Sequence, residues 1–190
     1  MTKFKRVWVK IKGSKPVRYK RGWKRILPKP TAKKRGKLAI AAARKDVGYA
    51  ESPPGSNKQK YGEHWGENGV AWCGLAVAYW WDKAGFGVTK DLALQIDYVP
   101  TLVSLAAAKE YHLSLVHSKR VRAGDAVAFD FDGGLADHVG LFARWIDQRN
   151  GVFETIEGNT AVGNDAAGGR VMRRTRYTSQ VAAFVRKIPS

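Results

Sequence analysis

The stretch NGVAWCGLAVAYWW, residues 68–81, contains Cys73, the only cysteine in a chain of 190 residues. Residues 73, 76, 77, 80 and 84 recur at the spacing of one helical face, and most residues between them are also apolar. The stretch therefore predicts a central, largely buried helix that begins beside Cys73.

Two interpretations of Cys73 follow from this position. Free cysteine is among the most buried residue types, so Cys73 taken alone is typical of a core residue. The start of a helix, however, offers unpaired amides and the positive end of the helix dipole, and both favour a thiolate. Cys73 is therefore a candidate nucleophile, provided that the fold supplies a base and a group that orients the base.

The segments around this stretch predict an α+β fold. Helical patterns are present at 37–48 and 101–112, and the polar segment 49–69 between the first helix and the Cys73 stretch is predicted to be a loop. Apolar residues then alternate with polar ones, which predicts strands at 125–131, 137–145, 151–159, 169–177 and 181–188. Helices followed by an antiparallel run of strands are the order of an α+β domain.

The net charge of +18 is concentrated at the N-terminus. Residues 1–37 hold sixteen of the 34 Lys and Arg residues and none of the 16 Asp and Glu residues. This asymmetry predicts a basic N-terminal arm and linker over residues 1–37 and a nearly neutral domain over residues 38–190. Within the arm, apolar and basic residues alternate on both sides of the turn-prone residues 13–16, which predicts a two-stranded ribbon with a basic face.

One histidine has the setting of a catalytic base. His138 begins an apolar strand directly after a turn, where side chains can line a cleft. Glu157 and Asn159 are two residues apart in a later strand and share a face if that strand continues so far. Either side chain could accept the proton of the far ring nitrogen of His138, so the spacing leaves the two interchangeable.

Four segments resemble the signature blocks of one protein family, in order. WCGLAVAYWWDKAG, RAGDAVAFDF, ADHVGLF and TIEGNT are similar to those of the CHAP family of cysteine, histidine-dependent amidohydrolases and peptidases, particularly the versions in phage endolysins. The resemblance covers residues 38–190 and implies a papain-like fold, with the nucleophile helix packed on an antiparallel sheet. It also implies roles for four residues: Cys73 as nucleophile, His138 as general base, Glu157 as the residue that orients His138, and Asn159 as a further polar member.

The function implied by the resemblance is hydrolysis of an amide bond in peptidoglycan, by a cysteine peptidase or an N-acetylmuramoyl-L-alanine amidase. Substrate contacts are expected from Tyr61, His64, Trp65 and Trp72. No cofactor is expected. No metal site is expected either, because the segment before Cys73 offers a calcium ion only Glu63 and Glu67, and residues 130–134 match a hairpin turn better than a calcium loop.

The basic arm supports competing functions. Its sixteen cations are interleaved with Trp8, Tyr19 and Trp23, as in proteins that bind nucleic acid. A phage protein that binds nucleic acid or another polyanion, with a non-catalytic domain, is therefore the alternative to a hydrolase, and a wall-binding or virion structural protein is a third. For a hydrolase, the arm is expected to bind an anionic cell-wall polymer or membrane surface.

The N-terminal pattern also predicts where the protein acts. No apolar run approaches the roughly 18 residues that span a bilayer, and no signal-peptide core follows the basic N-terminus. We therefore expect a monomer that is made in the host cytoplasm and acts on the cell wall after release, or as part of the virion.

Overall fold

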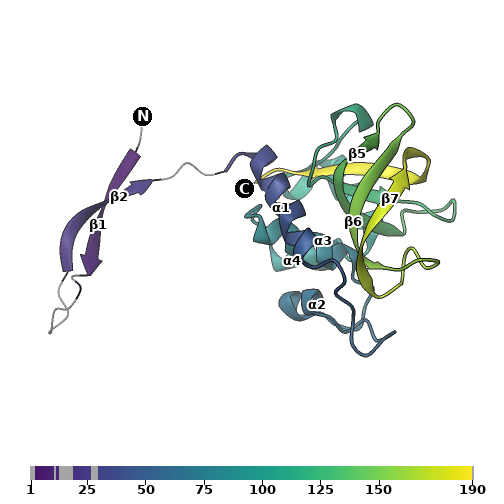
Figure 1. Cartoon of the computed structure of the whole chain (residues 1–190), viewed down its shortest axis with the longest axis horizontal. Helices are drawn as coiled ribbons and strands as arrows, with labels where there is room; N and C mark the ends of the chain where they lie inside the picture. The colour runs from purple at the N-terminus through teal and green to yellow at the C-terminus, as the bar shows by residue number, and fades with distance from the viewer. Residues whose placement is uncertain (1–2, 11, 13–18, 27–29, 190) are drawn as a thin grey trace. The chain divides into compact units, whose positions relative to one another are not determined.

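The structure is a computed structural model that describes residues 3–10, 12, 19–26 and 30–189. Two compact units make up the chain, Met1–Thr31 and Ala32–Ser190 (Figure 1). The division lies just before helix α1 (Ala32–Lys45), which therefore includes residues 32–37 that the charge pattern assigned to the arm and linker. The first turn of α1 is itself basic, so charge alone does not mark where this helix begins.

The N-terminal unit is an antiparallel ribbon. Strand β1 (Lys3–Lys10) pairs with β2 (Tyr19–Ile26), with Lys3 opposite Ile26 and Lys10 opposite Tyr19. The predicted ribbon is thus confirmed, whereas the predicted turn at 13–16 and the start of the linker at 27–29 lie outside the described residues.

Within the described residues of the larger unit, six strands form one antiparallel sheet in the order β3-β8-β4-β5-β6-β7. Their bounds are Leu113–Leu115 (β3), Ala126–Phe129 (β4), His138–Asp147 (β5), Val152–Thr160 (β6), Arg170–Tyr177 (β7) and Val181–Lys187 (β8). All five predicted strands are confirmed. Strand β3 was not predicted, since three residues are too few to show an alternating pattern.

The described helices after α1 are α2 (Lys60–Trp65), α3 (Cys73–Lys83), α4 (Lys90–Gln95) and α5 (Val99–Ala108), with 3-10 turns at Glu110–His112, Ser118–Arg120 and Thr178–Gln180. The α+β class is confirmed, and so is the helix that begins at Cys73. The prediction of a loop over 49–69 is wrong where α2 forms, because Gln59 caps the amides of Tyr61 and Gly62. None of the described helices combines the length and hydropathy needed to cross a membrane.

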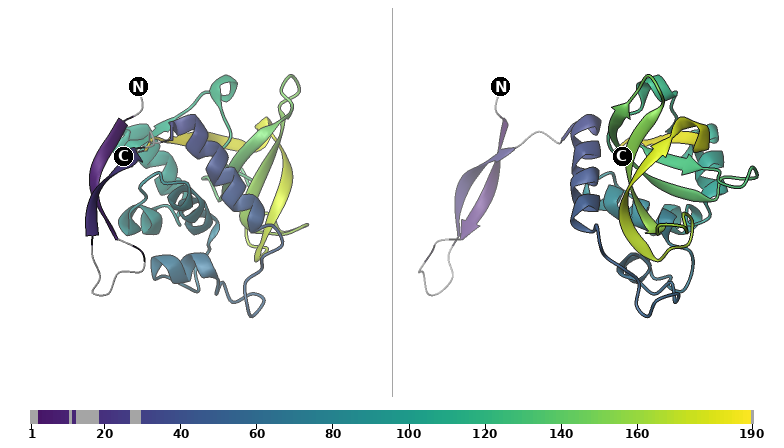
Figure 2. Two further views of the ribbon diagram at one scale, coloured as in Figure 1. Left: turned by 60° about the vertical axis from the view of Figure 1, so that its left-hand side comes forward. Right: turned by 45° about the vertical axis from the view of Figure 1, so that its right-hand side comes forward.

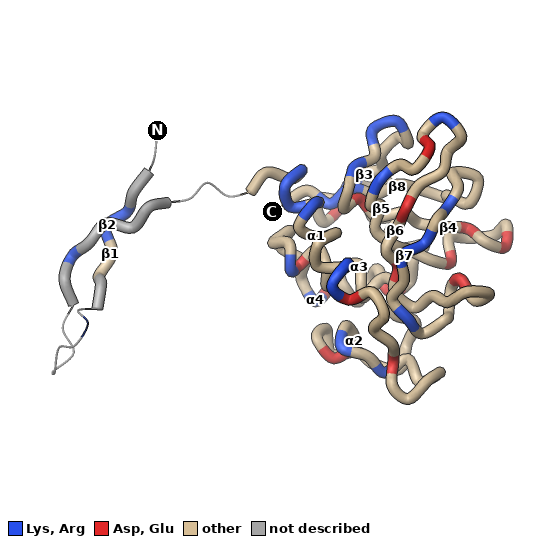
Figure 3. Tube along the Cα trace, in the orientation of Figure 1, with Lys and Arg blue, Asp and Glu red and all other residues tan. Residues whose placement is uncertain are grey.

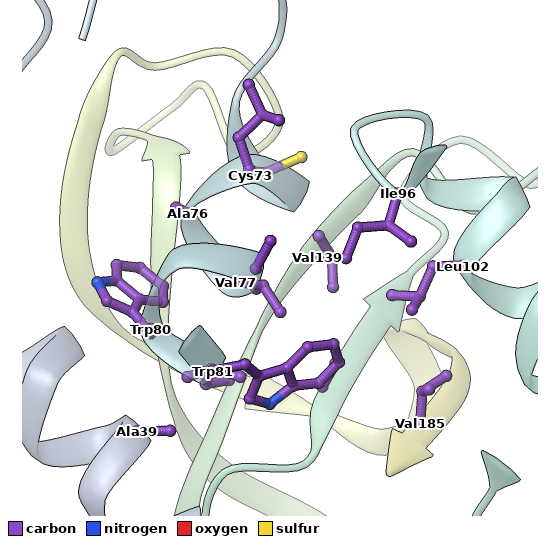
Figure 4. Packing of buried hydrophobic residues seen from close by; sticks show 14 of the residues in the cluster. Ala39, Cys73, Ala76, Val77, Trp80, Trp81, Ile96, Leu102, Val139 and Val185 are labelled. Atoms are coloured by element: carbon purple, nitrogen blue, oxygen red, sulfur yellow. The ribbon is translucent and has the colours of Figure 1, made fainter. Parts of the chain in front are cut away.

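Helix α3 is the centre of the larger unit. It packs against α1 on one side and against β5 and β6 on the other, and both views in Figure 2 show the helices together on one side of the sheet. Trp80 and Trp81 of α3 are fully buried with Val77 in the main hydrophobic core, which Figure 4 shows. The glycine at 158 allows β6 to approach the helix closely, because a Cβ there would lie 2.8 Å from the Cβ of Ala76.

Candidate active site

Cys73 is the first residue of α3, as predicted, and lies at the end of the apolar column of that helix in Figure 4. The residue is only 2 % exposed. Its neighbour Gly74 lets the first turn of α3 lie directly on the backbone of Ile96, because a Cβ at position 74 would overlap the Ile96 carbonyl. Packing of α3 on this backbone and on the sheet fixes the position of the thiol.

His138 is the first residue of β5 and pairs with Phe129 of β4. The ring is fully buried, and the rings of Phe129 and Phe131 stack beside it with centroids 6.1 and 5.9 Å away. Nε2 lies 3.1 Å from Oε2 of Glu157. The carboxylate therefore accepts the Nε2 proton, which leaves Nδ1 as the nitrogen available to exchange a proton with another group.

That other group is Cys73. Burial lowers the pKa of His138, but hydrogen bonding and charge interactions with Cys73 and Glu157 raise it by more, to about 9. No hydrogen bond to Nδ1 is present within the described residues. In catalytic sites without substrate such hydrogen bonds are often long or poorly aligned, and they tighten when substrate binds.

Glu157 lies in β6 opposite Gly140 of β5, and a Cβ at position 140 would overlap the Glu157 side chain. The carboxylate is fully buried and accepts hydrogen bonds from Thr155 and Arg176 as well as from His138. Burial raises the pKa of Glu157, but Arg176 and His138 lower it by more, to about 2. The group beside His138 is therefore a carboxylate and not a carboxylic acid at neutral pH.

Arg176 of β7 was not among the predicted site residues. It is 2 % exposed and binds both oxygens of Glu157, with Nε 2.9 Å from Oε1 and Nη2 2.6 Å from Oε2. Figure 3 shows the cations of β7 beside the acidic residues of β6. Four arginines lie in β7, and no sequence motif marks one of them. The register pairs Arg176 with Phe153, and only the packing of its long side chain brings the guanidinium to Glu157.

Asn159 does not contact His138 in the structure. The regular pairing of β6 with β7 breaks between Glu157 and Thr160, and Asn159 has a left-handed backbone with φ of 58°. This bulge ends the alternation of the strand, so the two-residue spacing no longer places Asn159 on the face of Glu157. Its amide instead binds the following loop, donating to Ala166 O at 3.3 Å and accepting from Gly169 N at 3.2 Å.

Comparisons of the chain with protein-family models, curated proteins and solved structures found no match. A thiol, an imidazole and a carboxylate adjoin one another in that order, and this order can generate a thiolate and an imidazolium. Free backbone amides in the first turn of α3 can bind a developing oxyanion.

Three of the four residues expected to contact substrate are part of the core. Trp72 and Tyr61 are fully buried and stack on one another with centroids 5.4 Å apart, and Trp65 is nearly as buried. Each polar atom has a partner in the fold, since Trp72 donates to Glu51, Tyr61 to Asp46 and Trp65 to the Leu75 carbonyl. These side chains pack in the core with α3.

His64, the fourth of these residues, is partly exposed. Its Nε2 lies 3.8 Å from Oδ2 of Asp82, and its ring packs against Tyr79. Asp82 is near the end of α3, whereas Cys73 begins the helix. The structure therefore places His64 away from the thiol and does not bring it to the candidate site.

One cluster of carboxylates among the described residues could share a cation. Asp130, Asp132 and Asp137 each place an oxygen within 4.8 Å of the others. Oδ1 of Asp130 already accepts hydrogen bonds from the amides of residues 132–134, and Asp132 accepts one from Gly134. These bonds within the turn account for the positions of two of the carboxylates, in keeping with the predicted hairpin turn.

Proposed function

We propose that this protein is a peptidoglycan hydrolase of the endolysin type, with a papain-like CHAP domain that cleaves an amide bond by nucleophilic catalysis. The observation that carries the proposal is the buried series of Cys73, His138 and Glu157. The carboxylate accepts a hydrogen bond from Nε2 of the imidazole, and Nδ1 is then available to accept the proton of the thiol. The CHAP resemblance of the segments that contain these residues supports peptidoglycan as the substrate.

The proposed reaction has two stages. Cys73 transfers its proton to His138, and the thiolate attacks the carbonyl carbon of the amide to give a tetrahedral oxyanion. Amides at the start of α3 stabilise that oxyanion, and His138 then protonates the leaving nitrogen. Water, deprotonated by His138, hydrolyses the remaining thioester and releases the carboxylate product and the free thiol. No cofactor is needed for these steps.

The two candidate enzyme classes differ in the bond that is cut. A cysteine peptidase would release a new amine and carboxylate within the wall peptide, whereas an N-acetylmuramoyl-L-alanine amidase would free the peptide from the lactyl group of the glycan. Mass spectrometry of fragments released from purified walls distinguishes these products. In either case the protein is proposed to act at the cell wall after release from the host cytoplasm, or from the virion.

The proposal is tested by purified Cys73→Ala in a cell-wall zymogram and a turbidity assay. We expect lysis to fall by orders of magnitude with the fold retained, because the sulfur supplies the nucleophile. His64→Ala is the matched control, since this histidine lies away from the thiol. Clearing of walls by Cys73→Ala at a rate near wild type would show that Cys73 is not the nucleophile.

The N-terminal unit favours a second function, binding of a polyanion. The backbone register of the ribbon pairs an aromatic residue with a cation at four positions: Phe4 with Arg25, Trp23 with Arg6, Trp8 with Arg21 and Tyr19 with Lys10. Trp8 is 66 % exposed, and the Arg21 guanidinium lies 5.5 Å from the centroid of its ring.

We propose an anionic cell-wall polymer or membrane surface as the partner of this ribbon, and single-stranded nucleic acid is the alternative. Cations suit all of these ligands, whereas stacking of bases on aromatic rings is specific to nucleic acid. Quenching of tryptophan fluorescence by teichoic acid, anionic vesicles and single-stranded DNA at matched charge compares them. Preferential quenching by DNA that persists in Cys73→Ala would favour the nucleic-acid-binding function.

A further inference from the structure

Four side chains from four elements form one continuous polar series in the core. Cys73 begins α3, His138 begins β5, Glu157 lies in β6 and Arg176 lies in β7. None of the four is more than 2 % exposed. The proposed reaction uses the first three members and leaves the role of the buried guanidinium unexplained.

The contacts of Arg176 are those of a residue that orients a carboxylate. Its Nε and Nη2 bind one oxygen each of Glu157, which is the two-point geometry that only arginine provides. Its guanidinium carbon lies 4.8 Å from the ring centroid of Phe131, and Nη1 lies 3.0 Å from Asp165. The Phe131 ring therefore covers one face of the planar guanidinium, and Glu157 and Asp165 bind its three nitrogens. The guanidinium cannot turn without releasing Glu157.

We propose that Arg176 is a positioning residue that acts on Cys73 through Glu157 and His138. It aims the Glu157 carboxylate at Nε2 of His138, and its charge balances that carboxylate, so the imidazolium charge is left to balance the thiolate. This role rests on the proposed nucleophilic chemistry of Cys73, and it adds to that chemistry a fourth residue that touches neither sulfur nor substrate.

The balance of charge explains why a cation is needed. When the Cys73 thiol ionises beside a protonated His138, the series holds a thiolate, an imidazolium, a carboxylate and a guanidinium, and its net charge falls from +1 to zero. Without the guanidinium the same ionisation takes the net charge from zero to −1, in a site that water barely reaches. Burial of an unbalanced charge is costly, so the thiolate would then form only at higher pH.

Other charged groups near the series do not replace Arg176. Asp137 adjoins His138 in sequence and interacts with its charge, and it is an anion. Asp165 is also an anion, and it lies at the more exposed end of the guanidinium. Arg174 is a second cation of β7, but its nitrogens bind Asp165 and the Ala161 carbonyl and not Glu157. Arg174 therefore serves as a matched control.

The experiment measures alkylation of Cys73 by iodoacetamide as a function of pH. Only the thiolate reacts, and the chain has no other cysteine, so the midpoint reports formation of this thiolate alone. The midpoint, unlike the plateau rate, does not depend on how easily the reagent reaches the sulfur. Variants Arg176→Gln, Arg176→Lys and Arg174→Gln are compared with wild type, each checked for folding by circular dichroism.

We expect the midpoint of Arg176→Gln to rise by about one pH unit or more, since loss of an opposite charge has effects of this order. Arg176→Lys keeps the charge and should keep the midpoint, but it loses the two-point contact and should lyse walls more slowly. Arg174→Gln should match wild type. Equal midpoints in Arg176→Gln and Arg174→Gln would overturn the proposal.

If Arg176→Gln does not fold, the rate of wall lysis by Arg176→Lys tests the proposal. A wild-type rate in that variant would contradict a positioning role. The alkylation assay uses no cell wall. If the wild-type protein fails to lyse walls while the alkylation midpoints of wild type and the variants are as expected, the proposed substrate is contradicted and the role of Arg176 is supported.

Discussion

Gly140 lies directly opposite Glu157, and the absence of a side chain at position 140 is what gives the Glu157 carboxylate its place beside His138. A Cβ on Gly140 would overlap the Cγ of Glu157 and approach the Ile156 carbonyl to 3.0 Å. The site thus depends on a residue that takes no part in the chemistry.

Gly140→Ala should therefore reduce activity strongly and lower the free energy of unfolding by about 1–3 kcal/mol, the usual cost of overpacking. Turbidity assays and thermal unfolding measure the two effects. Gly134→Ala is the control, because its Cβ would meet only the flexible Asp132 carboxylate, 3.1 Å away. Equal activity in the two variants would show that Glu157 can shift without loss of function.

Glu157→Gln should lower the alkaline limit of the activity profile. Burial lowers the pKa of His138, and Cys73 and Glu157 together raise it to about 9, so loss of the carboxylate removes one of the raising causes. The imidazolium would then lose its proton at lower pH, and activity would decline earlier as pH rises. Initial rates from pH 5 to 10, a range set by the ordinary pKa values of His and Cys, measure the pH at which activity declines on the alkaline side.

Asn159→Ala should leave that profile unshifted. The Asn159 amide binds Ala166 and Gly169 of the loop after β6 and makes no contact with His138. We expect a smaller loss of activity and faster proteolysis of the loop at 161–169. If the alkaline limit of the activity profile shifts as far in Asn159→Ala as in Glu157→Gln, the Asn159 amide also acts on the imidazole.

The stability of the fold should depend on pH through His138 and Glu157. The pKa of His138 is raised from 6.5 to about 9, so its contribution to stability is complete below pH 6.5 and is lost as pH rises through 9. The pKa of Glu157 is lowered from 4.5 to about 2, so its contribution is present above pH 4.5 and is lost as pH falls through 2.

Thermal unfolding of wild type should therefore show a falling Tm between about pH 6.5 and 9, and His138→Gln should reduce that slope. The comparison isolates His138, because the remaining titratable groups are the same in both proteins. A slope that is unchanged in His138→Gln would mean that other groups cause the loss of stability at alkaline pH.

Two truncations should separate the arm from the domain. Removal of residues 1–31 should leave the fold and hydrolysis of small soluble wall fragments intact, but weaken binding to whole walls, most at low salt. Removal of residues 1–37 also deletes Arg35, a buried residue whose guanidinium donates to the Ala84 and Gly85 carbonyls.

The longer truncation should lower the Tm as well, because the carbonyls at the end of α3 lose their partner. Circular dichroism melts and co-sedimentation with walls measure the two properties. Equal melting temperatures for the two truncations would mean that the first turn of α1 contributes nothing to the stability of the domain.

Periodicity in the sequence was enough to predict the helix that begins at Cys73 and five of the six strands of the described sheet. The apolar residues at 73, 76, 77 and 80 repeat with a helical period, and burial of one face demands that repeat wherever the helix packs. The same reasoning failed for α2, which begins because the Gln59 side chain caps it. A six-residue helix has too few turns to show a period.

Proximity along a strand was a weaker guide to the site. The spacing left Glu157 and Asn159 equivalent, and the bulge before Thr160 separated them. Tyr61 and Trp72 were expected to contact substrate, yet hydrogen bonds to Asp46 and Glu51 allow both to be buried. Such partners lie 15 and 21 residues away, beyond the reach of any local pattern.

The sequence by itself determined the α+β class, the basic ribbon, the place of Cys73 at a helix start, and His138 at the head of a strand. Each of these depends on local period, charge or turn chemistry. Only the tertiary structure decided that Glu157 meets Nε2 of His138 and that Arg176 holds Glu157. Those contacts depend on strand register and side-chain packing, which bring residues from β5, β6 and β7 together. Neither produces a periodic pattern in the sequence.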